Sequence, residues 1–282
     1  MSKPEKPKVE KPVKPHLSAS QIGLYNKCGE AYRRRYIEKH IIPPGAAMIR
    51  GTAVHAGAEF NFGQKVESKV DLPAGQVVER AADAVEQKVK NEGIELTAEE
   101  KTVGKDKVVG AIKDSAVALT AVLMTDIAPA ILPVGVEERV RIELPNATRD
   151  LLAILDIRTV DTVEDLKTGA KLKGKAVWQD DTQMTMYALT HRALTGKDPR
   201  VVRVHELVAT KTPKAVTHDL SYDNLDFEPL VRRINATLNG IEAGIFTPAT
   251  PGGWWCSAKW CGYHGDCPYV NGQRKAAGEM VE

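Results

Sequence analysis

The fold is decided by residues 151–167, which read LLAILDIRTVDTVEDLK. Two apolar runs, Leu151–Val160 and Val163–Lys167, flank the pair Asp161-Thr162, and this pattern predicts two strands joined by a tight hairpin turn. The first apolar run reaches Asp156 after Leu155, and the second contains Asp165. A hairpin of this kind brings the two carboxylates side by side.

The second strand carries Asp165-Leu166-Lys167. Side chains two apart on a strand share a face, so the carboxylate of Asp165 and the ammonium of Lys167 project into one space. Two neighbouring carboxylates remain ionised most easily around a cation, and Mg2+ or Mn2+ prefers such oxygen ligands. Lys167 could then act on a metal-bound water and on a phosphate, which indicates phosphodiester hydrolysis. Taken alone, charges at strand ends are more often simply exposed.

The remaining chain alternates between helical and strand periodicity. A capping box at Ser18 and Gln21 begins a helix that should run through Ile37, and a strand pattern starts at Val134. The other expected elements are helices near 46–62, 75–92, 97–128, 178–195 and 223–243, and strands at 201–209 and 214–220. This order predicts an α/β core in which helices flank a central mixed sheet, with a helical insertion at 63–133.

Composition is that of a globular protein, with 43% hydrophobic and 27% charged residues and a net charge of +2. We expect residues 1–16 to be a disordered Lys/Pro-rich tail, 17–270 to form one domain, and 271–282 to be a second flexible tail. No segment reaches the roughly 20 apolar residues of a membrane span, and the amino terminus lacks the apolar stretch of a secretory signal. A cytoplasmic protein without membrane contact is therefore expected.

The chain has four cysteines, and three of them lie close together near the carboxyl end. They are Cys28, Cys256, Cys261 and Cys267. In a reducing compartment such a cluster is more often a metal site than a pair of disulfides. A centre bound by all four cysteines, with 254–268 as the segment that carries three of them, would clip the two chain ends together. Unrelated thiols, and a zinc site completed by His264, are the alternatives.

Three further side chains are candidates for a site. Gln183 and Tyr187 are four apart on an expected helix and so share one face, where Gln183 can bind a water, phosphate or base. His55 lies between Gly51 and Gly57, in a run of small residues that another backbone or a ligand can approach closely. Each signal is weak alone, because such residues are usually structural.

Read in order, these motifs resemble the RecB-like branch of the PD-(D/E)XK nuclease superfamily. The similarity is to iron-sulfur exonucleases related to CRISPR-associated RecB-like nucleases and to the AddB nuclease domain, including phage-encoded relatives. It covers about residues 17–270. The matching residues are Arg50 to His55, Asp156, Asp165-Leu166-Lys167-Thr168-Gly169, Gln183 with Tyr187, and the four cysteines.

The resemblance implies a restriction-endonuclease-like core and assigns roles. His55, Asp156, Asp165 and the carbonyl of Leu166 would ligate the Mg2+ or Mn2+. Lys167 would act on the attacking water, and Gln183 and Tyr187 would position the substrate. Cys28, Cys256, Cys261 and Cys267 would hold a 4Fe-4S cluster. A further glutamate is expected on the preceding strand, where Glu137 is favoured over Glu138.

The function implied is a metal-dependent DNA exonuclease acting on single strands or DNA ends in recombination, repair or phage DNA metabolism. A recombination or helicase protein is the partner that the resemblance suggests. The alternative is a non-catalytic nucleic-acid-binding subunit of a recombination or CRISPR-adaptation complex. A zinc-stapled protein without nuclease activity is a third reading. Trp254, Trp255, Trp260 and Tyr263 surround the cysteines, either to shield a cluster or to stack on a base.

Overall fold

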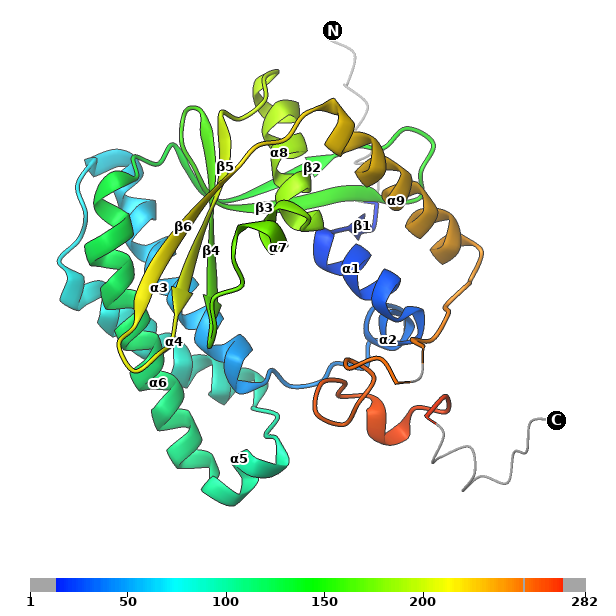
Figure 1. Cartoon of the computed structure of the whole chain (residues 1–282), viewed down its shortest axis with the longest axis horizontal. Helices are drawn as coiled ribbons and strands as arrows, with labels where there is room; N and C mark the ends of the chain where they lie inside the picture. The colour runs from blue at the N-terminus through cyan, green and yellow to red at the C-terminus, as the bar shows by residue number, and fades with distance from the viewer. Residues whose placement is uncertain (1–13, 251, 271–282) are drawn as a thin grey trace, which may run out of the picture.

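A computed structural model describes residues 14–250 and 252–270. Its centre is a mixed six-stranded sheet in the order β1-β3-β4-β5-β6, with β2 paired to the other edge of β3 (Figure 1). The strands are β1 His16–Leu17, β2 Gly135–Ile142, β3 Asp150–Arg158, β4 Thr162–Gly169, β5 Val201–Val208 and β6 Lys214–Leu220. The predicted hairpin is present, but its turn comprises residues 159–161 rather than the expected pair Asp161-Thr162, and the Thr159 N–H donates to the Thr162 carbonyl. The predicted α/β class with helices flanking a mixed sheet is confirmed.

The hairpin of β3 and β4 opens almost immediately after its turn. The two strands pair only through Ile157 with Glu164 and Arg158 with Val163. β1 pairs in parallel with the far end of β3, at Asp150 and Leu151. One edge of β3 therefore carries strand partners at both ends and none between them, and Asp156 is the first residue of that open stretch.

Helices cover the two faces of the sheet. The helices are α1 Ala19–Lys27, α2 Gly29–Tyr32, α3 Ala46–Ser68, α4 Ala74–Glu92, α5 Ala98–Val103, α6 Lys105–Val122, α7 Lys175–Gln179, α8 Thr182–Thr195 and α9 Asn224–Glu242, with π-helical turns η1 Arg33–Ile37 and η2 Leu123–Ile127 and 3-10 turns η3 Ala128–Ala130 and η4 His264–Asp266. One apolar core joins the sheet to α1, α8 and α9, and a second joins it to α3, α4 and α6. β3 contributes Leu155 to the first core and Ile157 to the second, with Asp156 between them.

Three predicted helices are interrupted. The helix expected over 18–37 breaks at Cys28, whose φ of −162° and ψ of 103° are extended, and whose sulfur accepts the Ala31 N–H as the cap of α2. The helix expected over 97–128 breaks at Gly104, with φ +94°. The helix expected over 178–195 breaks at Asp180, before Asp181 caps α8. In each case a side chain or glycine satisfies backbone groups that would otherwise belong to a continuous helix.

Two predicted boundaries shift. β1 begins at His16, inside the range expected to be a tail, and the backbone N–H of Asp150 donates to the Pro15 carbonyl. α3 continues to Ser68, so the expected start of the insertion at 63 falls inside this helix. Residues 1–13 and 271–282, where the remaining tails were predicted, lie outside the described part of the chain.

One helical stretch, Lys105–Ala130, is long and apolar enough to cross a bilayer by length and composition. The expectation that no segment meets this criterion was therefore too strict. The buried residues of α6 recur every three or four positions, at Val108, Ile112, Ala116 and Leu119, and lie in the core shared with α3 and α4. This spacing is that of a helix with one face in the core of a globular domain.

The cysteine-containing segment at the carboxyl end lies against α2 and η1 (Figure 1). Arg34 donates to the Asp266 carboxylate at 2.7 Å and to its carbonyl at 3.1 Å, and Tyr263 donates to the His40 carbonyl at 2.7 Å. The Gly29 N–H donates to the Thr247 carbonyl at 2.7 Å. Direct protein contacts thus join the two ends of the described chain.

The close backbone approach at Gly29 can be tested by substitution. A Cβ there would lie 2.7 Å from the Thr247 nitrogen and 2.8 Å from the Phe246 Cα, so Gly29→Ala must displace backbone. We expect the free energy of unfolding to fall by about 1–3 kcal/mol, measured by urea denaturation. Gly23→Ala is the matched control, since no atom lies within 4 Å of its Cβ, and helix propensity should raise stability by roughly 0.5–1 kcal/mol. Equal stabilities of the two variants would contradict the contact.

Candidate active site

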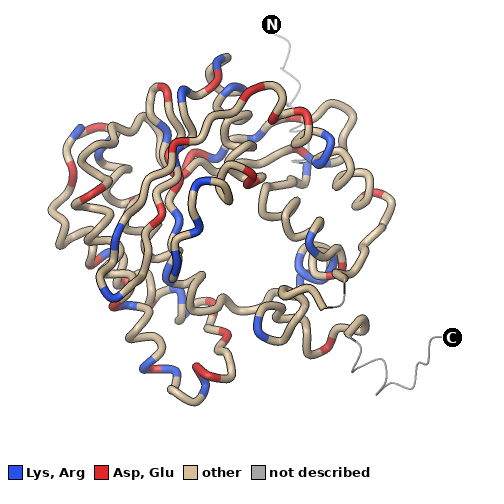
Figure 2. The backbone as a smooth tube through the Cα atoms, in the orientation of Figure 1, with Lys and Arg blue, Asp and Glu red and all other residues tan. Residues whose placement is uncertain are grey.

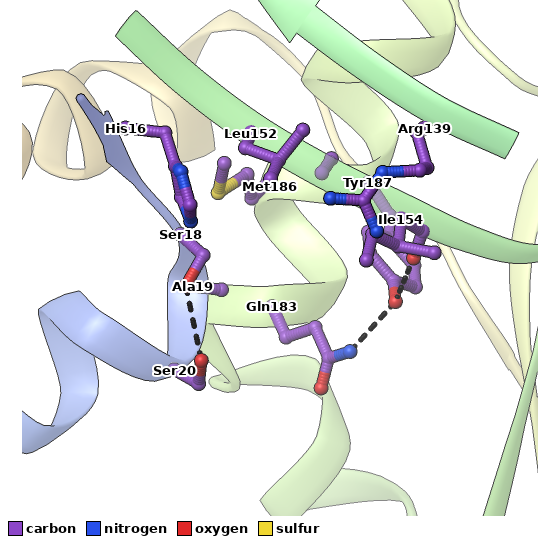
Figure 3. A pocket seen from close by; sticks show the side chains of 11 residues that line it. His16, Ser18, Ala19, Ser20, Arg139, Leu152, Ile154, Gln183, Met186 and Tyr187 are labelled. Carbon is purple, nitrogen blue, oxygen red and sulfur yellow. Dashed lines mark hydrogen bonds between the residues drawn. The ribbon is translucent and has the colours of Figure 1, made fainter. Parts of the chain in front are cut away.

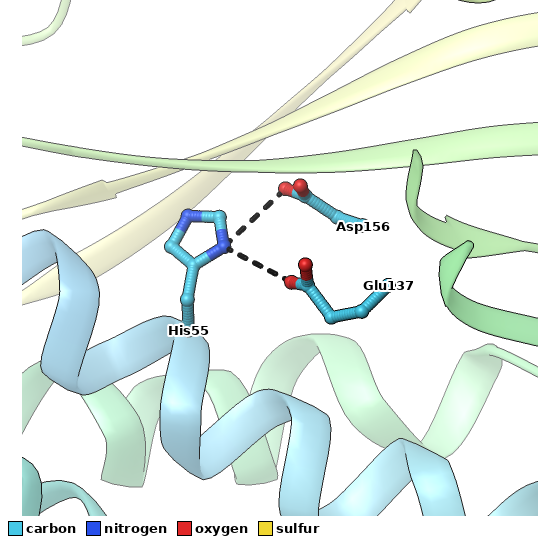
Figure 4. A group of neighbouring side chains, drawn as sticks. All are labelled: His55, Glu137 and Asp156. Atoms are coloured by element: carbon cyan, nitrogen blue, oxygen red, sulfur yellow. Dashed lines mark ion pairs between the residues drawn. The ribbon is translucent and has the colours of Figure 1, made fainter. Parts of the chain in front are cut away.

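His55, Glu137 and Asp156 form a cluster of potential metal ligands (Figure 4). They come from α3, β2 and β3, and one ligand atom of each lies within 4.8 Å of the others. His55 Nδ1 is 3.5 Å from Asp156 Oδ2 and 4.0 Å from Glu137 Oε1. A nitrogen and two carboxylates facing one point are a donor set that suits a divalent cation.

The opposite ring nitrogen of His55 is held by the backbone. Nε2 lies 2.9 Å from the Leu166 carbonyl oxygen, which can only accept, so Nε2 carries a proton. In the neutral ring this places the lone pair on Nδ1, which faces the carboxylates. Metal-binding histidines commonly donate their second N–H to a carbonyl in this way. The Leu166 carbonyl, predicted as a metal ligand, thus contacts His55.

Asp156 occupies the point where β3 and β4 separate. Its Oδ2 accepts the Leu166 N–H at 2.9 Å, in place of a strand-to-strand backbone bond. The β2–β3 register continues from Val136 opposite Ile157 to Glu138 opposite Leu155, which sets Glu137 opposite Asp156. Glu137 has φ +48°, a left-handed conformation that is costly for a residue with a side chain and that is often found at functional sites.

The neighbouring Glu138 has a different environment. Its carboxylate makes two hydrogen bonds to Arg158, at 2.6 and 2.8 Å. Of the two adjacent glutamates, Glu137 is the one that joins the cluster, as the sequence had favoured.

A chain of hydrogen bonds leads from Asp165 to the exposed edge of β3. Lys167 Nζ donates to Asp165 Oδ1 at 2.8 Å and to Gln183 Oε1 at 3.1 Å. Gln183 Nε2 donates to the Tyr187 hydroxyl at 2.7 Å, which in turn donates to the Ile154 carbonyl at 2.5 Å. The predicted residues of β4 and α8 therefore act as one unit, fixed to the unpaired stretch of β3.

Asp165 lies just outside the three-residue cluster. Its side chain is fully buried, and Oδ2 has no hydrogen-bond partner among the described residues. Burial raises its pKa, although Lys167 opposes this effect. A buried carboxylate oxygen without a partner is costly, and an additional cation or donor beside it would remove that cost.

The pKa values of Glu137, Lys167 and Tyr187 are shifted by burial and by the carboxylates that lie close together in the site. Burial, followed by the charge of Asp156, raises the pKa of Glu137 to about 7. Burial acts to lower the pKa of Lys167, but Asp165 and Asp156 outweigh it, so the pKa lies above its usual value and the ammonium remains charged. Burial raises the pKa of Tyr187 well above its usual value, so the hydroxyl remains a neutral donor. The site has excess negative charge that a bound cation would neutralise.

A pocket of about 270 Å³ opens beside this chain, lined by residues of β1, the start of α1, β2, β3 and α8 (Figure 3). Gln183 and Tyr187 form one side, while His16, Ser18 and Arg139 form the rim. The sequence did not single out His16 or Arg139. His16 belongs to a two-residue strand with no periodicity, and Arg139 is one of several charged residues alternating along β2, so neither gave a signal.

The four cysteines approach one another at the junction of the chain ends. Cys28 Sγ accepts backbone N–H groups of Ala31 and Ala249 at 3.4 and 3.3 Å. Burial raises the pKa of Cys261, and the other three thiols contribute in the same direction. No three ligand atoms of these cysteines and His264 lie within 4.8 Å of one another in the described part of the chain.

Comparisons with known proteins bear on the fold and the family of this chain. No curated protein matched the sequence. A candidate exonuclease from Eubacterium rectale, solved at 2.19 Å, has 13% identity and a TM-score of 0.57, with 95% of this chain and 89% of that one covered, and it supports the fold. A protein designated SSO0001 has 17% identity over 74% of this chain and 95% of its own, but its TM-score of 0.35 is too low to inform the fold.

The family model of the PD-(D/E)XK nuclease superfamily matches residues 16–268. That range begins with β1 and ends after Cys267, so it includes the open edge of β3, the acidic cluster and all four cysteines. The mixed sheet flanked by helices is consistent with the restriction-endonuclease-like core expected of such proteins. With nearly the whole described chain matched, the protein belongs to the PD-(D/E)XK nuclease superfamily.

Proposed function

We propose that this nuclease is a divalent-metal-dependent exonuclease that hydrolyses phosphodiester bonds in DNA, at single strands or DNA ends. The observation that supports it most is the meeting of two side-chain groups at the open edge of β3. The ligand cluster of His55, Glu137 and Asp156 reaches it from the α3 side, and the Asp165 to Tyr187 chain from the α8 side.

The residues suit a divalent cation, because three ligand atoms lie within 4.8 Å of one another, and Asp165 on the adjacent strand has a buried oxygen without a partner among the described residues. His55, Glu137 and Asp156 would hold the ion, with Asp165 as the next ligand. Bound Mg2+ or Mn2+ supplies positive charge to a phosphate oxygen and lowers the pKa of a bound water.

The protein's own groups position and stabilise the reacting phosphate. Lys167 is a permanent cation held by Asp165 and Gln183, and it can stabilise negative charge that develops on the phosphate. Gln183 spans Lys167 and Tyr187, so its amide orientation is fixed before a substrate arrives. Tyr187 anchors the chain to Ile154 and stays protonated. These intact groups have no evident use in a purely nucleic-acid-binding subunit.

The same proposal places the protein in the RecB-like iron-sulfur branch, with Cys28, Cys256, Cys261 and Cys267 holding a 4Fe-4S cluster. Backbone N–H groups donate to Cys28 Sγ, and hydrogen bonds of this kind to the ligand sulfurs are one means by which a protein tunes such a cluster. A 4Fe-4S cluster takes four cysteine ligands, and this chain has four cysteines, all within the range that the family model matches. Its role is a structural staple, added to the Arg34–Asp266 contact.

The adjacent residues Glu137 and Glu138 should differ in their contribution to metal binding. We expect Glu137→Gln to weaken Mn2+ binding by about tenfold or more, because it removes one charged ligand, measured by electron paramagnetic resonance titration. Glu138→Gln is the control, since this side chain pairs with Arg158 instead. It should leave Mn2+ affinity unchanged. An equal loss in both variants would contradict the assigned cluster.

Catalysis depends on the Lys167 cation. With Mg2+ or Mn2+ and end-labelled DNA, we expect Lys167→Ala and Asp165→Asn to lower kcat by roughly 100- to 1,000-fold. Lys214→Ala, at an exposed position on β6, should retain full activity. Parent protein that cleaves no faster than the two site variants would overturn the nuclease proposal and favour the non-catalytic binding subunit. Circular substrates test whether free ends are required.

The cluster proposal has its own readout. Anaerobically purified protein should be brown and contain about four irons per chain, and Cys28→Ser or Cys261→Ser should lose the iron and the visible absorbance. Since Arg34 and Gly29 still connect the chain ends, these variants should remain folded but less stable. A colourless protein with one zinc per chain would rule out the iron-sulfur assignment.

A further inference from the structure

Two of the four tryptophans are exposed, and they lie next to each other. Trp254 is 62% and Trp260 is 61% exposed, whereas Trp178 is only 3% exposed. The rings of Trp254 and Trp260 are 5.6 Å apart between centroids and almost perpendicular, at 88°. Exposed side chains of this size, grouped at one place, are characteristic of a binding surface.

The aromatic residues around the cysteines fall into two groups. Tyr263 is buried and hydrogen-bonded to His40, and Trp255 is half-buried, with its indole nitrogen out of contact with solvent. These two are placed to shield the thiols. Trp254 and Trp260 form the outer layer, because most of their surface remains accessible. Shielding therefore does not account for them.

Lysines surround the exposed pair. Lys27 Nζ lies 5.7 Å from the ring centroid of Trp254, and Lys259 Nζ lies 5.6 Å from that of Trp260. Both tryptophans and Lys27 line a pocket of about 470 Å³, and Lys173 reaches this pocket from the connection between β4 and α7. An aromatic surface bordered by cations suits a ligand that has both flat rings and negative charge.

Lys173 links this surface to the active site. Its backbone N–H donates to Glu206 Oε1 at 3.0 Å, and that of Gly174 donates to Glu206 Oε2 at 3.2 Å. Glu206 lies on β5, next to Lys167 of β4 in the parallel register. The connection is therefore anchored at the strand pair that carries the catalytic lysine. Figure 2 marks several basic positions in blue along this connection.

We propose that Trp254 and Trp260 form a stacking platform for unpaired bases of the DNA strand being degraded, with Lys27, Lys173 and Lys259 contacting the flanking phosphates. This inference rests on the proposed function. Single-stranded DNA is the chosen ligand because its bases expose their faces, which paired bases in a duplex do not, and because its charge complements the lysines. From the platform the strand passes Lys173 and reaches Lys167.

The test measures binding apart from cleavage. In an Asp165→Asn background without divalent metal, fluorescence anisotropy follows a labelled 20-residue oligothymidylate and a duplex of the same length. We expect Trp254→Ala with Trp260→Ala to weaken single-strand binding by about tenfold, and duplex binding much less. Trp254→Phe with Trp260→Phe should restore most of the affinity, because stacking needs only an aromatic ring. Leu225→Ala, another exposed apolar residue, is the control and should change nothing.

A charge variant provides an independent measurement. Lys259→Glu lies at an exposed position and should weaken binding of the oligonucleotide and flatten its salt dependence. The inference is overturned if the double alanine variant binds oligothymidylate as tightly as its parent, if it loses duplex binding equally, or if the parent binds no oligonucleotide. Cleavage by the wild-type protein is measured separately. Platform-dependent binding without metal-dependent cleavage would refute the nuclease proposal but leave the platform standing.

Discussion

The hydrogen bond from the Leu166 N–H to the Asp156 carboxylate is the contact on which the site depends. In a regular sheet that N–H would pair with the neighbouring strand, and β3 and β4 would remain joined along their length. The carboxylate satisfies the donor and lets the strands part without leaving an unpaired buried group. The gap then admits His55 from one face of the sheet, and Gln183 and Tyr187 from the other.

Several strained or buried groups lie around this gap. Glu137 has a left-handed backbone, one buried oxygen of Asp165 has no partner in the described part of the chain, and the pKa values of both carboxyls are raised. Such features cost stability, and the two apolar cores that enclose the gap offset them. Carboxylates that repel one another at short distance are stabilised when a cation binds between them. The local strain is therefore consistent with the metal-dependent chemistry of the superfamily.

Much of this could be predicted from the sequence, because the hairpin and its carboxylates follow from strand periodicity and turn residues. The break in the helix at Cys28 could not be predicted, because Tyr25, Tyr32 and Tyr36 keep helical spacing across it. The extended backbone at Cys28 depends on contacts with residues 247–249, which are far away in the sequence. β1 was missed because two residues carry no periodicity. The assignment of Asp165 as a metal ligand stays a prediction, because the distance of its carboxylate from His55 depends on how far the strands separate, which local pattern does not encode.

The joining of the chain ends has a consequence for biosynthesis. The ligand cluster of His55, Glu137 and Asp156 and the hydrogen-bond chain from Asp165 to Tyr187 lie within residues 55–187. They can therefore assemble while the last part of the polypeptide is still in the ribosome. Arg34 and Cys28 must wait for Asp266 and Ala249, more than two hundred positions later. During that interval the buried faces of α1 and α2 are only partly covered. The nascent chain is then most exposed to proteases and to misassociation, and the cysteine segment ends that exposure.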